Sequence, residues 1–112
     1  MCLLAILYRV AGDAPVVVAA NREEFYARGG DPPRRLDGVP AVGGVDPHHG
    51  GTWLGVNRHG VLVAVTNRRK STEPAVPRSR GLLVRDLLAQ PSAAEATAAA
   101  ITRAGDGQPC RL

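Results

Sequence analysis

The stretch that decides the fold is the apolar run at the start of the chain, Met1-Cys2-Leu3-Leu4-Ala5-Ile6-Leu7-Tyr8. An initiator Met is removed when a small residue follows it, and Cys is small enough, so the mature chain is expected to begin at Cys2. A thiol and a free α-amine would then belong to one residue, and the amine can serve as general base for a strongly nucleophilic side chain. The alternative is that Cys2 is a small buried residue that opens a strand, since free Cys is among the most buried residue types.

A second apolar run predicts a hairpin with the first. Residues 2–9 and 15–20 are separated by the connector Ala11-Gly12-Asp13-Ala14. Gly and Asp in a short connector between runs rich in branched residues are typical of an antiparallel hairpin. Both runs are continuously apolar and not alternating, so we expect the two strands to be largely buried. The polar residues 21–24 then leave the second strand close to the start of the first.

The remaining sequence predicts more antiparallel strands and then two helices. The expected elements are an irregular loop over 29–40, a short strand over 41–46, a turn over 48–51, a hairpin of strands 52–56 and 61–66 joined by 57–60, and helices over 81–89 and 93–103. Ser79 is the expected N-cap of the first helix, and Ser92 with Glu95 forms a capping box for the second. This order predicts an α+β fold. We expect residues 1–104 to form the folded portion and residues 105–112 to form an irregular tail. The small number of strands suggests that the chain is the N-terminal part of a larger domain.

Composition excludes several classes of protein. Of 112 residues, 45% are hydrophobic and 21% are charged, which is typical of a globular domain. The net charge of +4 is spread over several segments without interleaved aromatic residues, so nucleic-acid binding is not predicted. No signal peptide and no run long enough for a membrane span is found. The two cysteines, Cys2 and Cys110, form no disulfide framework, and a cytoplasmic location is expected.

The histidines and glycine pairs do not form a recognised site. His48-His49 and His59 are the obvious metal candidates, but adjacent His residues in a strand point to opposite faces and no Cys or carboxylate cluster lies at ligand spacing. We therefore predict no metal site. The pairs Gly43-Gly44 and Gly50-Gly51 do not precede a helix in a βαβ unit, so neither is a phosphate-binding loop.

The order of several motifs resembles one family. The motifs are Met1-Cys2, Ala20-Asn21-Arg22-Glu23-Glu24-Phe25, Gly50-Gly51-Thr52-Trp53-Leu54-Gly55-Val56, Asn57-Arg58-His59-Gly60, Thr66-Asn67-Arg68 and Ser79-Arg80-Gly81-Leu82-Leu83-Val84. They are similar to the successive motifs of the NRDE family, also called the transport and Golgi organisation 2 family. Members are typically about twice this length, so the chain is expected to be a truncated N-terminal portion.

That family is similar in turn to N-terminal-nucleophile hydrolases of the choloylglycine hydrolase and penicillin acylase type, whose fold is an αββα sandwich. The resemblance implies that Cys2 is the nucleophile, that Glu23 contacts its amine, and that Asn67 helps to form the oxyanion hole. The usual Asp of the family is Glu23 here, one methylene longer, and the further Asn and Arg of the hydrolase site would lie beyond Leu112.

Two functions therefore stay open at this point. The first is a Cys amidohydrolase that acts on a small non-peptide amide, with Asn21, Arg22 and Trp53 as binding residues and no cofactor. Core packing is the alternative role for Trp53, since Trp is usually well buried. The second is a non-catalytic handler of a ligand such as haem, because family members have been linked to haem trafficking and to Golgi and mitochondrial homeostasis. In that case Cys2, His48 or His49 would be the haem ligand. An inactive truncated fragment is the third alternative.

Overall fold

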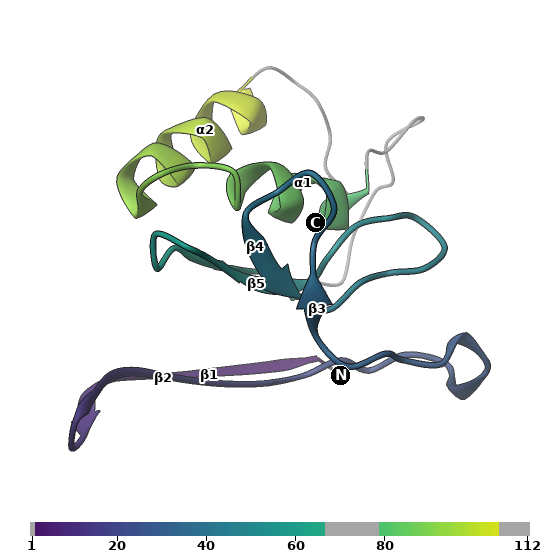
Figure 1. The fold of residues 1–112 in the computed structure, drawn as a ribbon, viewed down its shortest axis with the longest axis horizontal. Coiled ribbons are helices and arrows are strands. Elements are labelled where there is room, and N and C mark those ends of the chain that lie inside the picture. Colours follow the sequence, from purple (N-terminus) through teal and green to yellow (C-terminus); the bar gives the residue numbers. More distant parts are fainter. Residues whose placement is uncertain (1, 67–78, 106–112) are drawn as a thin grey trace.

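The computed structural model describes residues 2–66 and 79–105 (Figure 1). Its elements in chain order are β1 (Leu3–Ala11), β2 (Ala14–Asn21), the 3-10 turn η1 (Tyr26–Arg28), β3 (Arg34–Arg35), β4 (Ala41–Gly43), β5 (Leu54–Asn57), β6 (Leu62–Ala64), α1 (Arg80–Leu87) and α2 (Ala93–Gly105). Antiparallel strands followed by two helices confirm the predicted α+β class. Asn67, the polar stretch after it and the tail after Gly105 lie outside the described residues.

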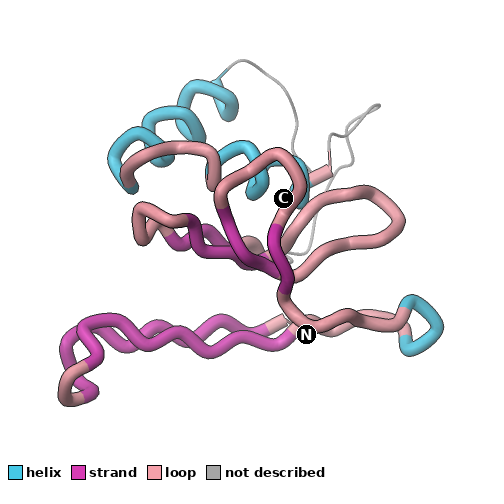
Figure 2. Tube along the Cα trace, viewed as in Figure 1, coloured by secondary structure: helices cyan, strands magenta, loops and turns pink. Residues whose placement is uncertain are grey.

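The elements are arranged in layers. Strands β3, β4, β5 and β6 form an antiparallel sheet in that order, and β1 and β2 form a separate two-stranded sheet. Helices α1 and α2 cover one side of the four-stranded sheet, and the β1–β2 hairpin lies on its other side and extends beyond it (Figures 1 and 2). The stacking order of helices, four-stranded sheet and two-stranded sheet corresponds to the first three layers of the expected αββα sandwich. A second helical layer is not found within residues 2–66 and 79–105.

The core lies between the helices and the four-stranded sheet. Two small clusters of buried residues form it: Leu36, Ala41, Val84 and Leu88 in one, and Val61, Leu87 and Ala96 in the other. Leu88 is fully buried. Helix α2 begins with the predicted capping box, in which the Glu95 N–H donates to Ser92 Oγ (3.2 Å) and the Ser92 hydroxyl donates to the Glu95 carboxylate (2.8 Å).

Two glycines allow the start of α1 to touch the loop before β5. The Thr52 N–H donates to the Gly81 carbonyl oxygen (3.1 Å), and a Cβ added at Gly51 would lie 2.6 Å from the carbonyl carbon of Gly81. Only a residue without a side chain permits two backbones to approach so closely. The predicted N-cap Ser79 occupies the N-cap position of α1, but its side chain makes no capping hydrogen bond. Backbone packing therefore does more than side-chain capping to place this end of the helix.

The turn between β5 and β6 is fixed to the end of α1 by Asn57, which is 5% exposed. Its Nδ2 group donates to the carbonyl oxygens of Leu88 (3.0 Å) and Gln90 (2.7 Å), and its Oδ1 accepts the N–H groups of His59 (2.9 Å) and Val61 (3.0 Å). The predicted hairpin of β5 and β6 is confirmed. Its turn is closed by a hydrogen bond from the Gly60 N–H to the Asn57 carbonyl oxygen (3.0 Å), and Gly60 has a φ of 79°.

Two expectations were wrong. The β1–β2 hairpin forms with the predicted connector, but its side chains are not largely buried: Leu3 is 65% exposed and Ile6 is 59% exposed. Continuous apolar composition predicts a strand covered on both faces, and among residues 2–66 and 79–105 only one side of the hairpin faces another layer (Figure 1). The loop expected over 29–40 contains the short strand β3, because Arg34 and Arg35 pair with the edge of β4.

Candidate active site

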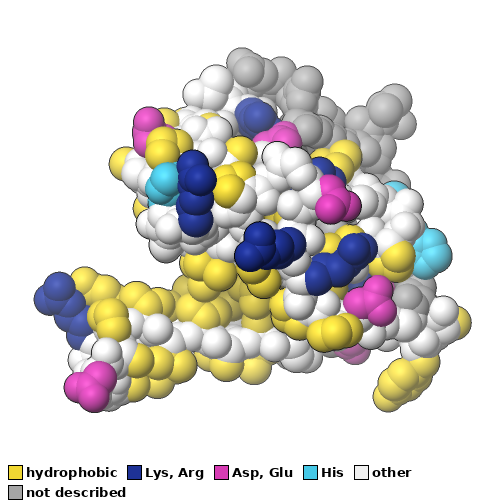
Figure 3. Space-filling view, viewed as in Figure 1, with side chains coloured by type: hydrophobic (Ala, Val, Ile, Leu, Met, Phe, Trp, Pro, Cys, Tyr) yellow, Lys and Arg dark blue, Asp and Glu magenta, His cyan; other side chains and the backbone are white. Residues whose placement is uncertain are grey.

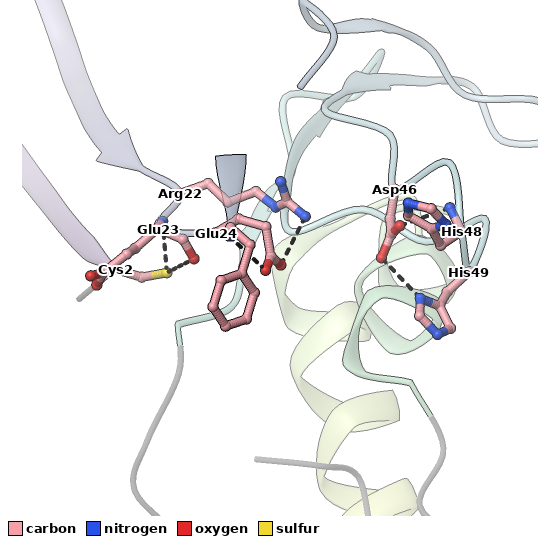
Figure 4. Close-up of polar contacts among 8 residues, drawn as sticks. Cys2, Arg22, Glu23, Glu24, Asp46, His48 and His49 are labelled. Carbon is pink, nitrogen blue, oxygen red and sulfur yellow. Dashed lines mark hydrogen bonds and ion pairs between the residues drawn. The ribbon is translucent and has the colours of Figure 1, made fainter. Parts of the chain in front are cut away.

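The pairing of β1 with β2 brings Cys2 and Glu23 into contact. Leu3 lies opposite Asn21 in the hairpin, so residue 2 and residue 23 meet just beyond the ends of the two strands. The Glu23 backbone N–H donates to Cys2 Sγ (3.4 Å), and the Cys2 thiol donates to the Glu23 carbonyl oxygen (4.0 Å; Figure 4). The predicted proximity of the polar residues to the start of the first strand is thus confirmed.

Asn21 holds the start of β1 in place. Its Oδ1 accepts the backbone N–H of Leu3 at 2.6 Å. Sequence reasoning assigned Asn21 to ligand binding, and the structure shows its side-chain oxygen bonded to the residue that follows Cys2. Asn21 therefore fixes the backbone from which the thiol projects.

Cys2 lies in the wall of a cavity of about 390 Å³. The cavity is lined by the start of β1, the segment after β2, the strands β5 and β6, and the first residues of α1. Leu4, Leu54 and Val65 contribute apolar surface, and Arg22, Glu23 and Arg80 contribute charge. Ligand pockets typically have volumes of about 300–1,000 Å³ and combine apolar walls with a few polar groups. The thiol thus lies beside a space large enough for a small molecule.

Arg22 is held over Trp53 in this cavity. The guanidinium carbon lies 4.7 Å from the centroid of the indole ring, and Nη2 forms an ion pair with the Glu24 carboxylate (3.2 Å). The ring of Trp53 also packs against Gly44, where an added Cβ would lie 2.2 Å from ring atom Cζ2. Trp53 is half-buried and lines the cavity, so packing and cavity lining are both roles of this side chain. An arginine fixed by a ring and a carboxylate presents its remaining N–H groups in a defined direction.

A second polar pair, Asp46 with His49, lines the cavity away from Cys2, with Arg22 and Glu24 between them (Figure 4). Asp46 Oδ2 lies 3.2 Å from His49 Nδ1, and Asp46 Oδ1 accepts the His48 backbone N–H (2.9 Å). Sequence reasoning considered these histidines only as metal or haem ligands. The signal it missed is an Asp two residues before a His pair in a turn, a spacing that lets the carboxylate bind the turn backbone.

Not every predicted residue is placed. Asn67 lies outside the described residues, although Thr66, which precedes it, lines the cavity. Glu23 contacts Cys2 through its backbone, and the proposed contact of its carboxylate with the α-amine stays a prediction. Within the described parts of the chain, no group of three His, Cys, Asp or Glu residues could hold a metal ion, and no helix is long and apolar enough to cross a membrane.

Comparisons with known proteins agree with the order of motifs. The family model described as Transport and Golgi organisation 2 matches residues 1–109. The Transport and Golgi organization protein 2 homolog of Bos taurus is 38% identical over 80 residues, and the Mus musculus and Homo sapiens homologs are 36% identical over 81 residues. Each alignment covers 65% of this chain and 28% of the relative, so the match spans less than a third of the length of these proteins. No solved structure matches. Because the family model matches 109 of the 112 residues, the chain belongs to the Transport and Golgi organisation 2 family.

Proposed function

We propose that the chain carries the nucleophile of a Cys N-terminal-nucleophile amidohydrolase that acts on a small non-peptide amide. The observation that supports this best is the position of Cys2: its sulfur accepts the Glu23 N–H in the wall of a cavity of about 390 Å³. A reducing, cytoplasmic location also forms part of the proposal, because the two cysteines of the sequence form no framework of disulfide spacings.

The reaction follows from one residue that holds both nucleophile and base. Cys2 Sγ forms a bond to the amide carbon while its proton passes to the α-amine of the same residue. The amine then protonates the leaving nitrogen as the C–N bond breaks and leaves a thioester. Water attacks the thioester, the C–S bond breaks, and a carboxylic acid and the free thiol result.

The neighbouring residues have separate parts in this proposal. The Glu23 N–H holds the sulfur of Cys2 in position, and the Glu23 carboxylate orients the amine. Asn67 stabilises the tetrahedral oxyanion, a role that rests on the resemblance to the hydrolases. Asn21 positions the backbone of Leu3, and Arg22 donates to a polar group of the substrate.

The mass of the intact protein tests the proposal. We expect Met1 to be absent, and iodoacetamide and a β-lactam or acyl-amide probe to label Cys2 far faster than Cys110. Cys110 is the internal reference, because both thiols meet the same reagent in the same chain. Cys2→Ala should abolish the fast adduct and Cys110→Ala should leave it unchanged. Retention of Met1, or equal labelling of the two thiols, would refute the catalytic proposal.

A second candidate function is haem binding at the same cavity. Cys2 and His49 both line it, and thiolate and imidazole are both axial ligands of haem iron. His48 is not among the lining residues, so His48→Ala is a matched control for His49→Ala. If the cavity binds haem, a shifted absorbance band should appear on titration and should be lost in Cys2→Ala or His49→Ala but not in the control. The absence of a band, or its loss in the control alone, would reject this function.

A further inference from the structure

The acidic side chains that line the cavity beside the Cys2 thiol already have partners within the protein. The Glu24 carboxylate forms an ion pair with Nη2 of Arg22 (3.2 Å), which also matches the charge of that arginine. Asp46 Oδ2 lies 3.2 Å from the ring nitrogen Nδ1 of His49. In the proposed function, the remaining carboxylate of the wall orients the α-amine.

A second arginine of the wall, Arg80, has no acidic partner in the described parts of the chain. Within residues 2–66 and 79–105, its guanidinium forms no hydrogen bond and no ion pair. Its own helix supplies no partner, because the first turn of α1 contains no acidic residue and the side chains three and four positions further on are Leu83 and Val84. Arg80 therefore adds an unmatched positive charge to the wall of the cavity.

The partial burial of Arg80 distinguishes it from the arginines at the surface. Several positively charged side chains lie at the surface of the molecule, where water solvates them (dark blue in Figure 3), and Arg34, Arg35 and Arg58 are all exposed. Arg80, in contrast, is half-buried. A charged group that is partly removed from water loses hydration, and a hydrogen-bonded group of opposite charge compensates for this loss.

The start of α1 fixes the position of Arg80 at the cavity. The carbonyl oxygen of the next residue, Gly81, accepts the Thr52 N–H (3.1 Å), and a Cβ added at Gly81 would lie 3.1 Å from the Cα of Gly51. Thr52 and Gly81 both line the cavity together with Arg80. The backbone that carries Arg80 is therefore packed against the loop before β5, and the guanidinium belongs to a fixed part of the wall.

We infer that the amide bound in this cavity carries a carboxylate and that Arg80 binds this carboxylate. The inference rests on the proposed function, since it names the class of amide that Cys2 attacks. A guanidinium binds a carboxylate through two parallel N–H···O hydrogen bonds. One unmatched positive charge fits the single charge of a carboxylate. A phosphate carries a charge of about −1.5 to −2 at neutral pH, and the acidic side chains of the wall would repel the excess.

Alkylation of Cys2 by iodoacetamide measures binding beside the thiol without the catalytic step. N-acetylglycine carries the expected carboxylate, and N-acetylglycinamide is its neutral counterpart. In the full chain, N-acetylglycine should slow the alkylation of Cys2 several-fold and leave that of Cys110 unchanged. The concentration that halves the rate should be at least about tenfold lower for N-acetylglycine than for N-acetylglycinamide, as expected for a hydrogen bond between charged groups. Inorganic phosphate should protect less than N-acetylglycine.

Variants test whether Arg80 carries this preference for the acid. Arg80→Gln should abolish it, and Arg80→Lys should retain part of it, because the charge remains but the paired donors are lost. Arg58→Gln is the matched control and should keep the full preference, since Arg58 is exposed and is not among the lining residues. An unchanged preference in Arg80→Gln would overturn the inference. In the wild-type chain, which needs no variant to fold, equal protection by the acid and the neutral amide, or by inorganic phosphate and the acid, would also overturn it.

Labelling of the same protein by an acyl-amide probe separates this inference from the proposed function. If the probe fails to label Cys2 while N-acetylglycine still protects the thiol through Arg80, the hydrolase proposal fails and the carboxylate site stands. If the probe labels Cys2 while the acid and the neutral amide protect it equally, the hydrolase proposal stands and the carboxylate site fails.

Discussion

Replacing Asn57 by Ala should remove a large part of the stability of the folded chain. This side chain makes four hydrogen bonds to the backbone and is 5% exposed, so it joins the β5–β6 turn to the end of α1. Of the four, the bonds to the Leu88 carbonyl oxygen and from the Val61 N–H are buried, and the other two are partly buried. Strands β5 and β6 and the start of α1 all line the cavity, so this junction also supports the candidate site.

The loss of stability in Asn57→Ala depends on which of the former hydrogen-bond partners of Asn57 can bond to water instead. A buried backbone group left without a partner costs about 1–3 kcal/mol, and two such groups result here. The two partly buried groups can bond to water, and each then costs little. The expected decrease in the free energy of unfolding is therefore about 3 kcal/mol, with a range of about 2–6 kcal/mol. Asn57→Asp should cost at least as much, because it retains the acceptor but directs a second oxygen at two carbonyl groups.

Urea unfolding followed by circular dichroism measures this change. At a slope of about 1–3 kcal/mol/M, a loss of about 3 kcal/mol lowers the midpoint by about 1–3 M. Protein concentration must be held constant, because association alters apparent stability. Thr97→Ala is the control, since it removes one exposed hydrogen bond to the Ala93 carbonyl oxygen and should change stability by less than about 0.5 kcal/mol. A loss of less than about 1 kcal/mol for Asn57→Ala would refute the reasoning.

Three further changes test other contacts. Gly51→Ala should destabilise the fold by about 1–3 kcal/mol in urea unfolding, because the new Cβ would lie 2.6 Å from the Gly81 carbonyl carbon; an unchanged midpoint would show that α1 can shift freely. Ser92→Ala should cost about 1 kcal/mol through the loss of the capping box, and a cost equal to that of an exposed alanine substitution would contradict this. Arg22→Gln should slow labelling of Cys2 by an acyl-amide probe more than labelling by iodoacetamide, since the proposed role of Arg22 is to donate to a polar group of the substrate; equal slowing by both reagents would argue against a binding role.

Local patterns in the sequence were sufficient to predict most elements of the fold. The connector Ala11–Ala14 and the turn at residues 57–60 both contain a Gly with positive φ, at 41° for Gly12 and 79° for Gly60, and both were identified from turn-forming residues. The capping box of Ser92 was identified because it depends on two side chains three residues apart. Such features need no information from distant parts of the chain.

Burial and the finer contacts of the site could not be predicted in this way. The exposure of Ile6 depends on whether another layer covers the hairpin, which composition does not reveal. The pairing of Arg22 with Glu24 and Trp53 requires the segment after β2 to meet the loop before β5, a contact between residues about thirty positions apart. The contact of Cys2 with residue 23 was expected, but the Cys2 sulfur meets backbone atoms of Glu23. From side-chain chemistry alone, the carboxylate of Glu23 would be expected to make this contact.

The position of the Cys2 thiol depends on how well the β1–β2 hairpin is held in its folded conformation. The hydrogen bond from the Glu23 N–H to sulfur and the bond from the Leu3 N–H to Asn21 both join the ends of β1 and β2, and neither involves the four-stranded sheet. The other wall of the cavity belongs to β5, β6 and α1, which the main core supports. Because a two-stranded ribbon is marginally stable alone, the Cys2 thiol keeps this geometry only while further contacts hold the hairpin in place. Contacts that order the hairpin therefore also contribute to the alignment of Cys2 with the rest of the cavity.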